Sequence, residues 1–163
     1  MSFSCEQPHP FKKLENEKVV FIPLAIYNLD SIPPEIAQLK KVEELTVSLD
    51  SIMGWTIYPP LSANMERISK PPYKTLPDEL GTLTSLKKLD ISGLNLKSLP
   101  PSFKQLQNLE HINLAMNKLD ISKDLPMLLS LPKLKVLSVA GNKVDAGLIR
   151  EWKVTYPNID IQW

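Results

Sequence analysis

The chain has 163 residues and a formal net charge of +1, with 43% hydrophobic and 23% charged residues. This composition is typical of a soluble folded protein with room for one domain. The net charge does not supply the basic excess by which a DNA- or RNA-binding face is usually recognised. The longest apolar run, Val19 to Ile22, is far shorter than the roughly 20 residues of a membrane-spanning helix. We therefore expect no nucleic-acid partner and no membrane span.

Cys5 is the single cysteine, so an intramolecular disulfide is excluded. This favours a reducing compartment or a bacterial origin. The first ten residues lack the charged start and apolar stretch of a signal peptide, and we expect a cytoplasmic protein in which Cys5 is a free thiol. The alternative is a surface or periplasmic lipoprotein, in which a leader has been removed and Cys5 carries the lipid.

Residues 1–18 precede the repeating pattern described below and are expected to form an irregular N-terminal cap. Pro8 and Pro10 disfavour regular structure in this segment. Phe11 and Leu14 are expected to cover the open end of the first repeat, because a terminal repeat leaves one flank of its core without a neighbour.

Residues 19–158 divide into five units with a common spacing of apolar residues. The pattern is complete in Leu86–Asn108, with apolar residues at 86, 89, 91, 94, 96, 99, 103 and 106. The next unit opens 23 residues later, at Leu109. A fixed period of this length, with LxxLxL followed by asparagine, indicates a horseshoe solenoid. The predicted units are 19–41, 42–85, 86–108, 109–133 and 134–158.

The second unit is about 21 residues longer than the others, and we place an insertion at 53–75. The insertion contains residue types that are enriched at protein interfaces: Trp55, Tyr58, Arg67 and Tyr73. A loop of this length is usually functional or disordered. The alternative is a loop that packs on its own repeat and covers it with these aromatic side chains.

Each unit is expected to place a short strand on the inner face of the solenoid. The segments PPEIAQL, PDELGTL and PPSFKQL are expected to return along the convex side as short helices, since proline suits a first helical turn. Asn117 and Asn142 stand where a side-chain amide can bond backbone groups of adjacent turns. At the other end, Asp145 is expected to cap a helix, and residues 159–163 to form a final strand and C-terminal cap. Three aromatic residues are expected to seal this end of the core, with a binding role as the alternative: Trp152, Tyr156 and Trp163.

The pattern LxxLxLxxNxLxxLPxxLxxL, best kept in Leu86–Asn108, resembles the 23-residue leucine-rich repeats of intracellular signalling scaffolds and many bacterial proteins. The resemblance covers about residues 19–161. It implies an α/β right-handed horseshoe with a parallel concave sheet, short helices or 3-10 turns on the convex side, and a platform that most often binds another protein. Tyr27 and Leu94 stand in place of the expected asparagine. The kinase, ubiquitin-ligase and GTPase domains that sometimes accompany such repeats are not recognisable in the sequence, so their activities are not implied.

Alternate strand residues are expected to face the concave surface in three columns. The columns are Phe21, Glu44, Lys88, His111 and Val136; then Pro23, Thr46, Asp90, Asn113 and Ser138; then Ala25, Ser48, Ser92, Ala115 and Ala140. From them we select seven candidate partner-binding residues: Glu44, Thr46, Lys88, Asp90, His111, Asn113 and Ser138. We expect these side chains to contact a polypeptide. The alternative is that they are merely solvated on the exposed face of the strands.

The sequence offers little for catalysis, and we expect no enzyme, no metal and no cofactor. The two histidines, His9 and His111, lie in the tail and on the sheet, and the five glycines form no phosphate-binding loop. His111 beside Asp90 on adjacent strands is the one pair suited to acid–base chemistry, and a simple hydrogen bond is the favoured alternative.

The sequence thus predicts a single-domain, monomeric, non-enzymatic module. We expect it to bind a polypeptide partner through the concave sheet and the 53–75 insertion. Two alternatives remain: a surface-anchored lipoprotein acting as an adhesin or glycan-binding protein, and an inhibitor that binds an enzyme and blocks it.

Overall fold

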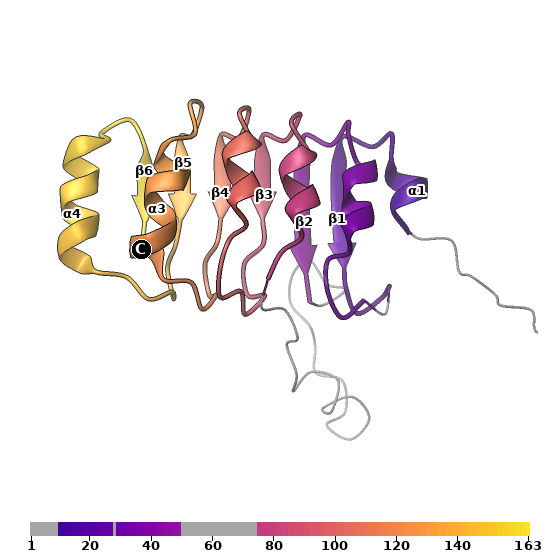
Figure 1. The fold of residues 1–163 in the computed structure, drawn as a ribbon, viewed down its shortest axis with the longest axis horizontal. Helices are drawn as coiled ribbons and strands as arrows, with labels where there is room; N and C mark the ends of the chain where they lie inside the picture. The colour runs from indigo at the N-terminus through magenta and orange to yellow at the C-terminus, as the bar shows by residue number, and fades with distance from the viewer. Residues whose placement is uncertain (1–9, 28, 50–74) are drawn as a thin grey trace, which may run out of the picture.

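The computed structural model describes residues 10–27, 29–49 and 75–163. They contain one open sheet of six parallel strands whose order in space is their order in the chain, β1 to β6. The helices lie along one face of this sheet, and no helix covers the other face in the described part of the chain (Figure 1). The predicted α/β solenoid with a parallel sheet is confirmed.

The elements alternate between the two layers. In chain order they are α1 (Pro10–Leu14), β1 (Val19–Pro23), η1 (Pro34–Gln38), β2 (Glu44–Ser48), η2 (Asp78–Thr82), β3 (Lys88–Asp90), η3 (Pro101–Gln105), β4 (His111–Asn113), α3 (Ile121–Leu129), β5 (Val136–Ser138), α4 (Ala146–Thr155) and β6 (Asp160–Gln162), where η denotes a 3-10 helix. No helix within the described ranges is long and apolar enough to cross a membrane.

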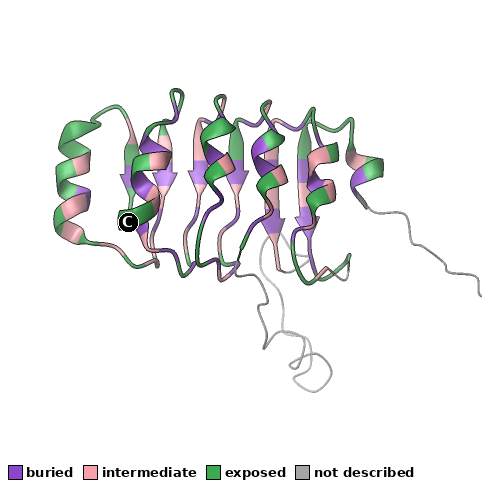
Figure 2. Ribbon diagram, in the orientation of Figure 1, coloured by how far each residue is buried: buried purple, intermediate pink, exposed green. Residues whose placement is uncertain are grey.

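The core is a continuous apolar layer between the sheet and the convex helices (Figure 2). The apolar positions of the predicted repeat are buried, and Leu94, which replaces the expected asparagine, is fully buried among them. Complete burial of a leucine contributes about 1.5–3 kcal/mol. Stacking of these side chains from repeat to repeat therefore stabilises the solenoid.

Prolines set the start of the convex turns. Pro33, Pro77 and Pro100 each precede a 3-10 helix in an extended conformation. Pro34 and Pro101 then occupy the first turn, where the missing N–H would have had no helical partner. These compact turns pack closely, so that a Cβ added to Gly81 would lie 2.5 Å from the carbonyl oxygen of Ser102 in the next repeat.

The first strand differs from the prediction in register. Val20 lies opposite Leu45 and Ile22 opposite Val47, two residues earlier than the sequence pattern suggested. Val20, Ile22 and Leu24 are all buried, so the apolar alternation alone fits both registers. The first repeat has two more residues between its strand and its convex turn than the third repeat has. Ile22 and Ile36 are 14 residues apart, whereas the equivalent Ile91 and Phe103 are 12 apart.

The two ends are covered unequally. Phe11 is fully buried and Leu14 packs on the core, as predicted for the N-terminal cap. The expectation of an irregular cap is wrong for Pro10–Leu14, which form the short helix α1, because proline fits the first turn of a helix. At the C-terminal end, Trp152 packs against the core, but Tyr156 is 38% and Trp163 49% exposed. The prediction that all three aromatic residues seal this end is wrong, because α4 ends at Thr155 and Trp163 lies beyond β6, which has a neighbouring strand on one side only.

Candidate functional site

Two columns of side chains cross all six strands on the concave face, which no helix of the described residues covers. The strand register gives the first as Val19, Glu44, Lys88, His111, Val136 and Asp160, and the second as Phe21, Thr46, Asp90, Asn113, Ser138 and Gln162. The first two predicted columns are confirmed for β2 to β5, and the third stays a prediction there, because its residues lie beyond β3, β4 and β5. On β1 the predicted columns are wrong by two residues, since Phe21 lies beside Thr46 and not beside Glu44.

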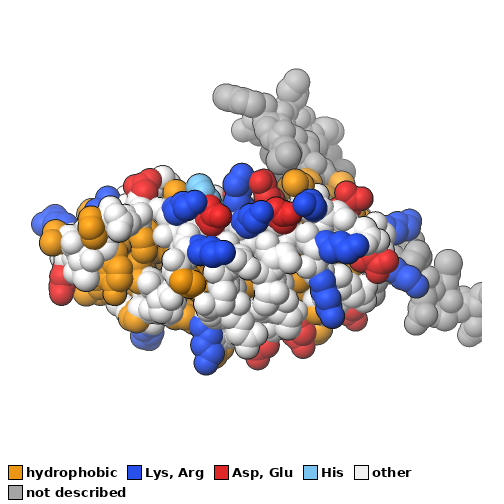
Figure 3. All heavy atoms as spheres, turned by 90° about the horizontal axis from the view of Figure 1, so that it is seen from above, with side chains coloured by type: hydrophobic (Ala, Val, Ile, Leu, Met, Phe, Trp, Pro, Cys, Tyr) orange, Lys and Arg blue, Asp and Glu red, His pale blue; other side chains and the backbone are white. Residues whose placement is uncertain are grey.

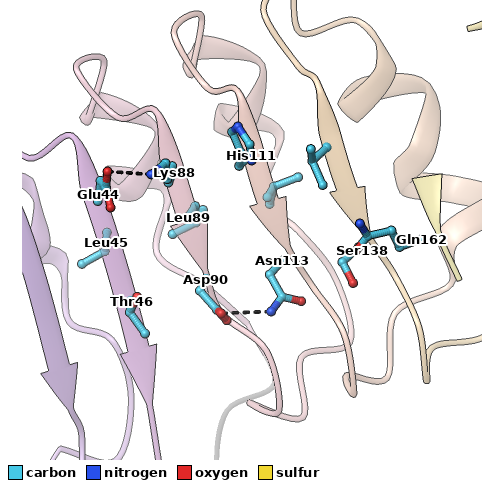
Figure 4. Close-up of a pocket in the computed structure, with 12 residues that line it drawn as sticks. Glu44, Leu45, Thr46, Lys88, Leu89, Asp90, His111, Asn113, Ser138 and Gln162 are labelled. Atoms are coloured by element: carbon cyan, nitrogen blue, oxygen red, sulfur yellow. Dashed lines mark hydrogen bonds and ion pairs between the residues drawn. The ribbon is translucent and has the colours of Figure 1, made fainter. Parts of the chain in front are cut away.

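A shallow concavity of about 320 Å³ lies over β2 to β6 (Figure 4). Its lining includes all seven candidate residues that the sequence placed on the concave sheet: Glu44, Thr46, Lys88, Asp90, His111, Asn113 and Ser138. Gln162 also lines it and was missed, although it stands opposite Ser138 on the strand predicted at the chain's end. The other four candidates, Trp55, Tyr58, Arg67 and Tyr73, lie outside the described residues.

Asp90 and Asn113 bond to each other and to their own strand ends. Asp90 Oδ2 accepts a hydrogen bond from Asn113 Nδ2 at 2.9 Å. Asp90 Oδ1 accepts from the N–H and the hydroxyl of Ser92 at 3.0 and 2.7 Å. Asn113 Oδ1 accepts from the N–H of Ala115 at 3.1 Å. These two side chains therefore help to hold the turns that follow β3 and β4.

His111 is not the register partner of Asp90. It lies opposite Lys88, and Asp90 lies opposite Asn113, two residues further along the strand. Two residues of a strand span about 6.6 Å, so the pairing suggested for acid–base chemistry is replaced by the Asp90–Asn113 bond.

The first column contains an ion pair between its second and third residues, Glu44 and Lys88. Lys88 Nζ donates to Glu44 Oε1 at 2.8 Å across β2 and β3. Within the described part of the chain, the side chains of Thr46, His111 and Ser138 make no hydrogen bond, so their polar atoms are available to a ligand.

A second set of charges lies at the edge where the strands begin. One residue before the first column, the sign alternates from repeat to repeat, and we call this set the charged rim: Lys18, Glu43, Lys87, Glu110 and Lys135. Glu43 bonds Lys18 at 2.8 Å and Lys87 at 2.5 Å, and Glu110 bonds Lys135 at 2.5 Å. Figure 3 looks onto this edge and shows blue and red side chains interleaved.

These bonds shift the acidic pKa values downward. Hydrogen bonds from the Lys18 and Lys87 ammonium groups lower the pKa of Glu43 from 4.5 to about 2. The Lys135 ammonium lowers the pKa of Glu110 in the same way. Both carboxylates are therefore ionised at neutral pH. Among the described residues, no group of three or more histidines, cysteines or acids is arranged to hold a metal ion.

The repeat spacing, the parallel sheet and the uncovered concave face define a leucine-rich-repeat protein. Residues 85–106 match the family model described as Leucine Rich Repeat. A leucine-rich-repeat structure from Leptospira interrogans is similar with a TM-score of 0.50 and 21% identity, over 83% of this chain and 34% of that one. This likeness supports the fold alone. The chain thus has the fold of a leucine-rich-repeat solenoid, and the match to the repeat model supports a resemblance to leucine-rich-repeat proteins.

Curated relatives match over much of this chain but little of their own length. The probable inactive serine/threonine-protein kinase roco10 of Dictyostelium discoideum is 30% identical over 119 residues, which are 70% of this chain and 4% of that protein. The flightless-1 homolog of Caenorhabditis elegans is 26% identical over 129 residues, 78% of this chain and 8% of that protein. Because these relatives are eukaryotic and the similar structure is bacterial, the expected bacterial origin stays a prediction.

Proposed function

We propose that this chain is a non-enzymatic protein-interaction module that binds a polypeptide through its concave sheet. Leucine-rich-repeat proteins generally act as protein–protein interaction modules, which supports the class of function. The observation that carries the proposal is the uncovered face itself, on which Thr46, His111 and Ser138 retain hydrogen-bonding capacity within the described structure.

The shape of the surface suits an extended chain. Neighbouring strands lie about 4.8 Å apart, so the five strands from β2 to β6 extend about 19 Å, on the order of six extended residues. Small-molecule sites are usually enclosed and mostly apolar. This concavity is shallow, and the side chains that it presents are polar apart from Val136, because Leu45, Leu89 and Ile112 are buried in the core. Such a surface favours a polypeptide.

The 53–75 insertion is the second contact region in this proposal. Its interface-type residues support it on sequence grounds alone, because it lies outside the described residues apart from Thr75. The likeness to a probable inactive kinase covers 4% of that protein and supports no kinase activity here. Aromatic platforms for a glycan are supplied mainly by the same insertion, so the glycan alternative also depends on it.

The test is a crosslinking pull-down from the source lysate with four forms of the protein. They are the intact chain, Ser138→Arg on the concave face, Gln105→Arg on the exposed side of η3, and a form with residues 53–75 replaced by a short Gly-Ser link. We expect Ser138→Arg to lose a partner that Gln105→Arg keeps. Equal capture by both arginine variants would overturn the concave site, and loss only in the linker form would place recognition in the insertion.

A further inference from the structure

We propose that the partner segment is acidic and places a carboxylate against Lys88 and His111, near the middle of the concave face. This inference rests on the function proposed above and adds the chemistry of the partner.

Lys88 and His111 form a pair of hydrogen-bond donors in the first column. They are register partners on β3 and β4, and both line the concavity (Figure 4). A lysine ammonium has three donors, and Lys88 uses one on Glu44. The His111 imidazole donates from at least one nitrogen and bonds no other described residue. A carboxylate accepts through two oxygens, so it can bond both side chains.

The surrounding charges favour an anion at this point. On β3 to β5, the rim and first column contain Lys87, Lys88 and Lys135 against Glu110 alone. On β1 and β2 they contain Lys18 against Glu43 and Glu44, and on β6 they contain Asp160. The excess of positive charge is thus confined to β4, which carries His111, and to the two neighbouring strands, β3 and β5. A surface with one sign of charge in its middle attracts the opposite charge on its partner.

The nearest acid in the second column does not oppose this binding strongly. Asp90 accepts hydrogen bonds from Ser92 and Asn113 on both of its oxygens, which disperses its charge. Glu44 is the direct competitor, because it already occupies one donor of Lys88. The side chains of Glu44 and Lys88 are 44% and 54% exposed, and exposed ion pairs of this kind are weak. A carboxylate of the partner can therefore displace Glu44.

The neighbouring side chains define the rest of the motif. Val136 follows His111 in the first column and offers a half-buried apolar contact. Thr46 and Ser138 lie in the second column on either side of the Asp90–Asn113 bond and offer hydroxyls to the peptide backbone. The expected ligand is an extended segment with an Asp or Glu next to an apolar residue.

The test is to select binders from a displayed library of random nonapeptides with the intact chain. Enriched peptides are then synthesised as acids and as matched amides, with Glu→Gln or Asp→Asn. We expect acidic residues to be enriched, and affinity to fall about tenfold or more for the amide peptide and for the Lys88→Met variant, since hydrogen bonds to charged groups are the strong ones. Glu44→Gln should raise the affinity, because it frees Lys88, and Lys104→Met on η3 should leave it unchanged.

The remaining outcomes separate the two proposals. In one outcome, the Ser138→Arg variant no longer binds the selected peptides, but these peptides lack an acidic residue or bind the Lys88→Met variant unchanged. This result would overturn the acidic partner and keep the concave site. Peptides that bind Ser138→Arg unchanged, or a library with no enriched sequence, would overturn the proposed function itself.

Discussion

Asn117 and Asn142 donate hydrogen bonds to the same carbonyl oxygen, that of Leu114, at 2.9 and 2.8 Å. Asn117 lies in the repeat of Leu114 and Asn142 in the next, so one oxygen joins two turns of the solenoid. Asn117 Oδ1 also accepts from the N–H groups of Leu94 and Leu96, both at 3.0 Å, in the preceding repeat. These buried backbone groups lie beyond the strands, and the asparagine amides satisfy them.

Asn117→Ala should be among the most destabilising single changes. It leaves two buried N–H groups without an acceptor, at about 1–3 kcal/mol each, so the free energy of unfolding should fall by about 3 kcal/mol. Urea unfolding followed by circular dichroism measures this, with Asn158→Ala at an exposed position as the control. A loss of unfolding free energy no larger than that of the control would show that the hydrogen bonds of Asn117 contribute little to stability.

Gly81→Ala should weaken the contact between η2 and η3. The added Cβ would lie 2.5 Å from the oxygen and 2.6 Å from the Cβ of Ser102, so one 3-10 helix must shift. Overpacking of this kind costs about 1–3 kcal/mol. The matched control is Gly147→Ala in α4, where the nearest atom is Asp145 Oδ1 at 3.1 Å and helix propensity favours alanine. Similar denaturation midpoints for both variants would contradict the expected clash.

Met116→Gly should not destabilise the protein and should raise its stability slightly. Gly93, Met116 and Gly141 stand at equivalent turn positions with φ of 69°, 57° and 74°. A non-glycine residue pays about 1–2 kcal/mol for this left-handed conformation, which outweighs the entropy that glycine adds to the unfolded chain. Met116 is 70% exposed, so little burial is lost.

Gly141→Ala makes the opposite kind of change, from glycine to a larger residue, at the equivalent turn position of the next repeat. A Cβ at this position would lie 2.6 Å from Met116 Sδ and 3.2 Å from its Cα, and it would carry the unfavourable φ as well. Thermal unfolding of the single variants and of the double variant should show that Met116→Gly relieves part of the loss. Strict additivity would mean that the two residues do not interact.

Glu43 should make stability depend on pH in the acid range. Its pKa is about 2 in the folded state and near 4.5 in the unfolded chain, so the unfolded state takes up the proton first as the pH falls. The stabilisation is complete above about pH 5 and is lost between about pH 5 and 2. Glu110 and Asp120 shift in the same direction through Lys135 and Lys143.

Glu43→Gln should therefore flatten the dependence of the melting temperature on pH between 5 and 2. Lys87→Met, which removes one of the two partners of Glu43, should flatten it less. Melting curves recorded at several pH values in this range measure the effect. Parallel curves for the unchanged chain and Glu43→Gln would show that the rim bonds do not form in solution.

Local sequence signals determined the repeat architecture. The apolar residues of Leu86–Asn108 recur at spacings that only a coil of fixed length can bury together, and Pro100 marks where the convex turn begins. The role of Asn117 and Asn142 was predictable from the sequence, because a side-chain amide at this position of the repeat can bond backbone groups of adjacent turns. The concave candidates on β2 to β5 followed from the alternation of a strand.

Tertiary structure decided what depends on contacts between repeats. The register of β1 could not be read from alternating apolar residues, since a shift of two keeps the same side chains inward. The Asp90–Asn113 bond and the charged rim join residues 23 to 44 positions apart, and their pairing follows from the stacking of the strands. The exposure of Trp163 likewise depends on which neighbours pack beside it and not on its hydrophobic character.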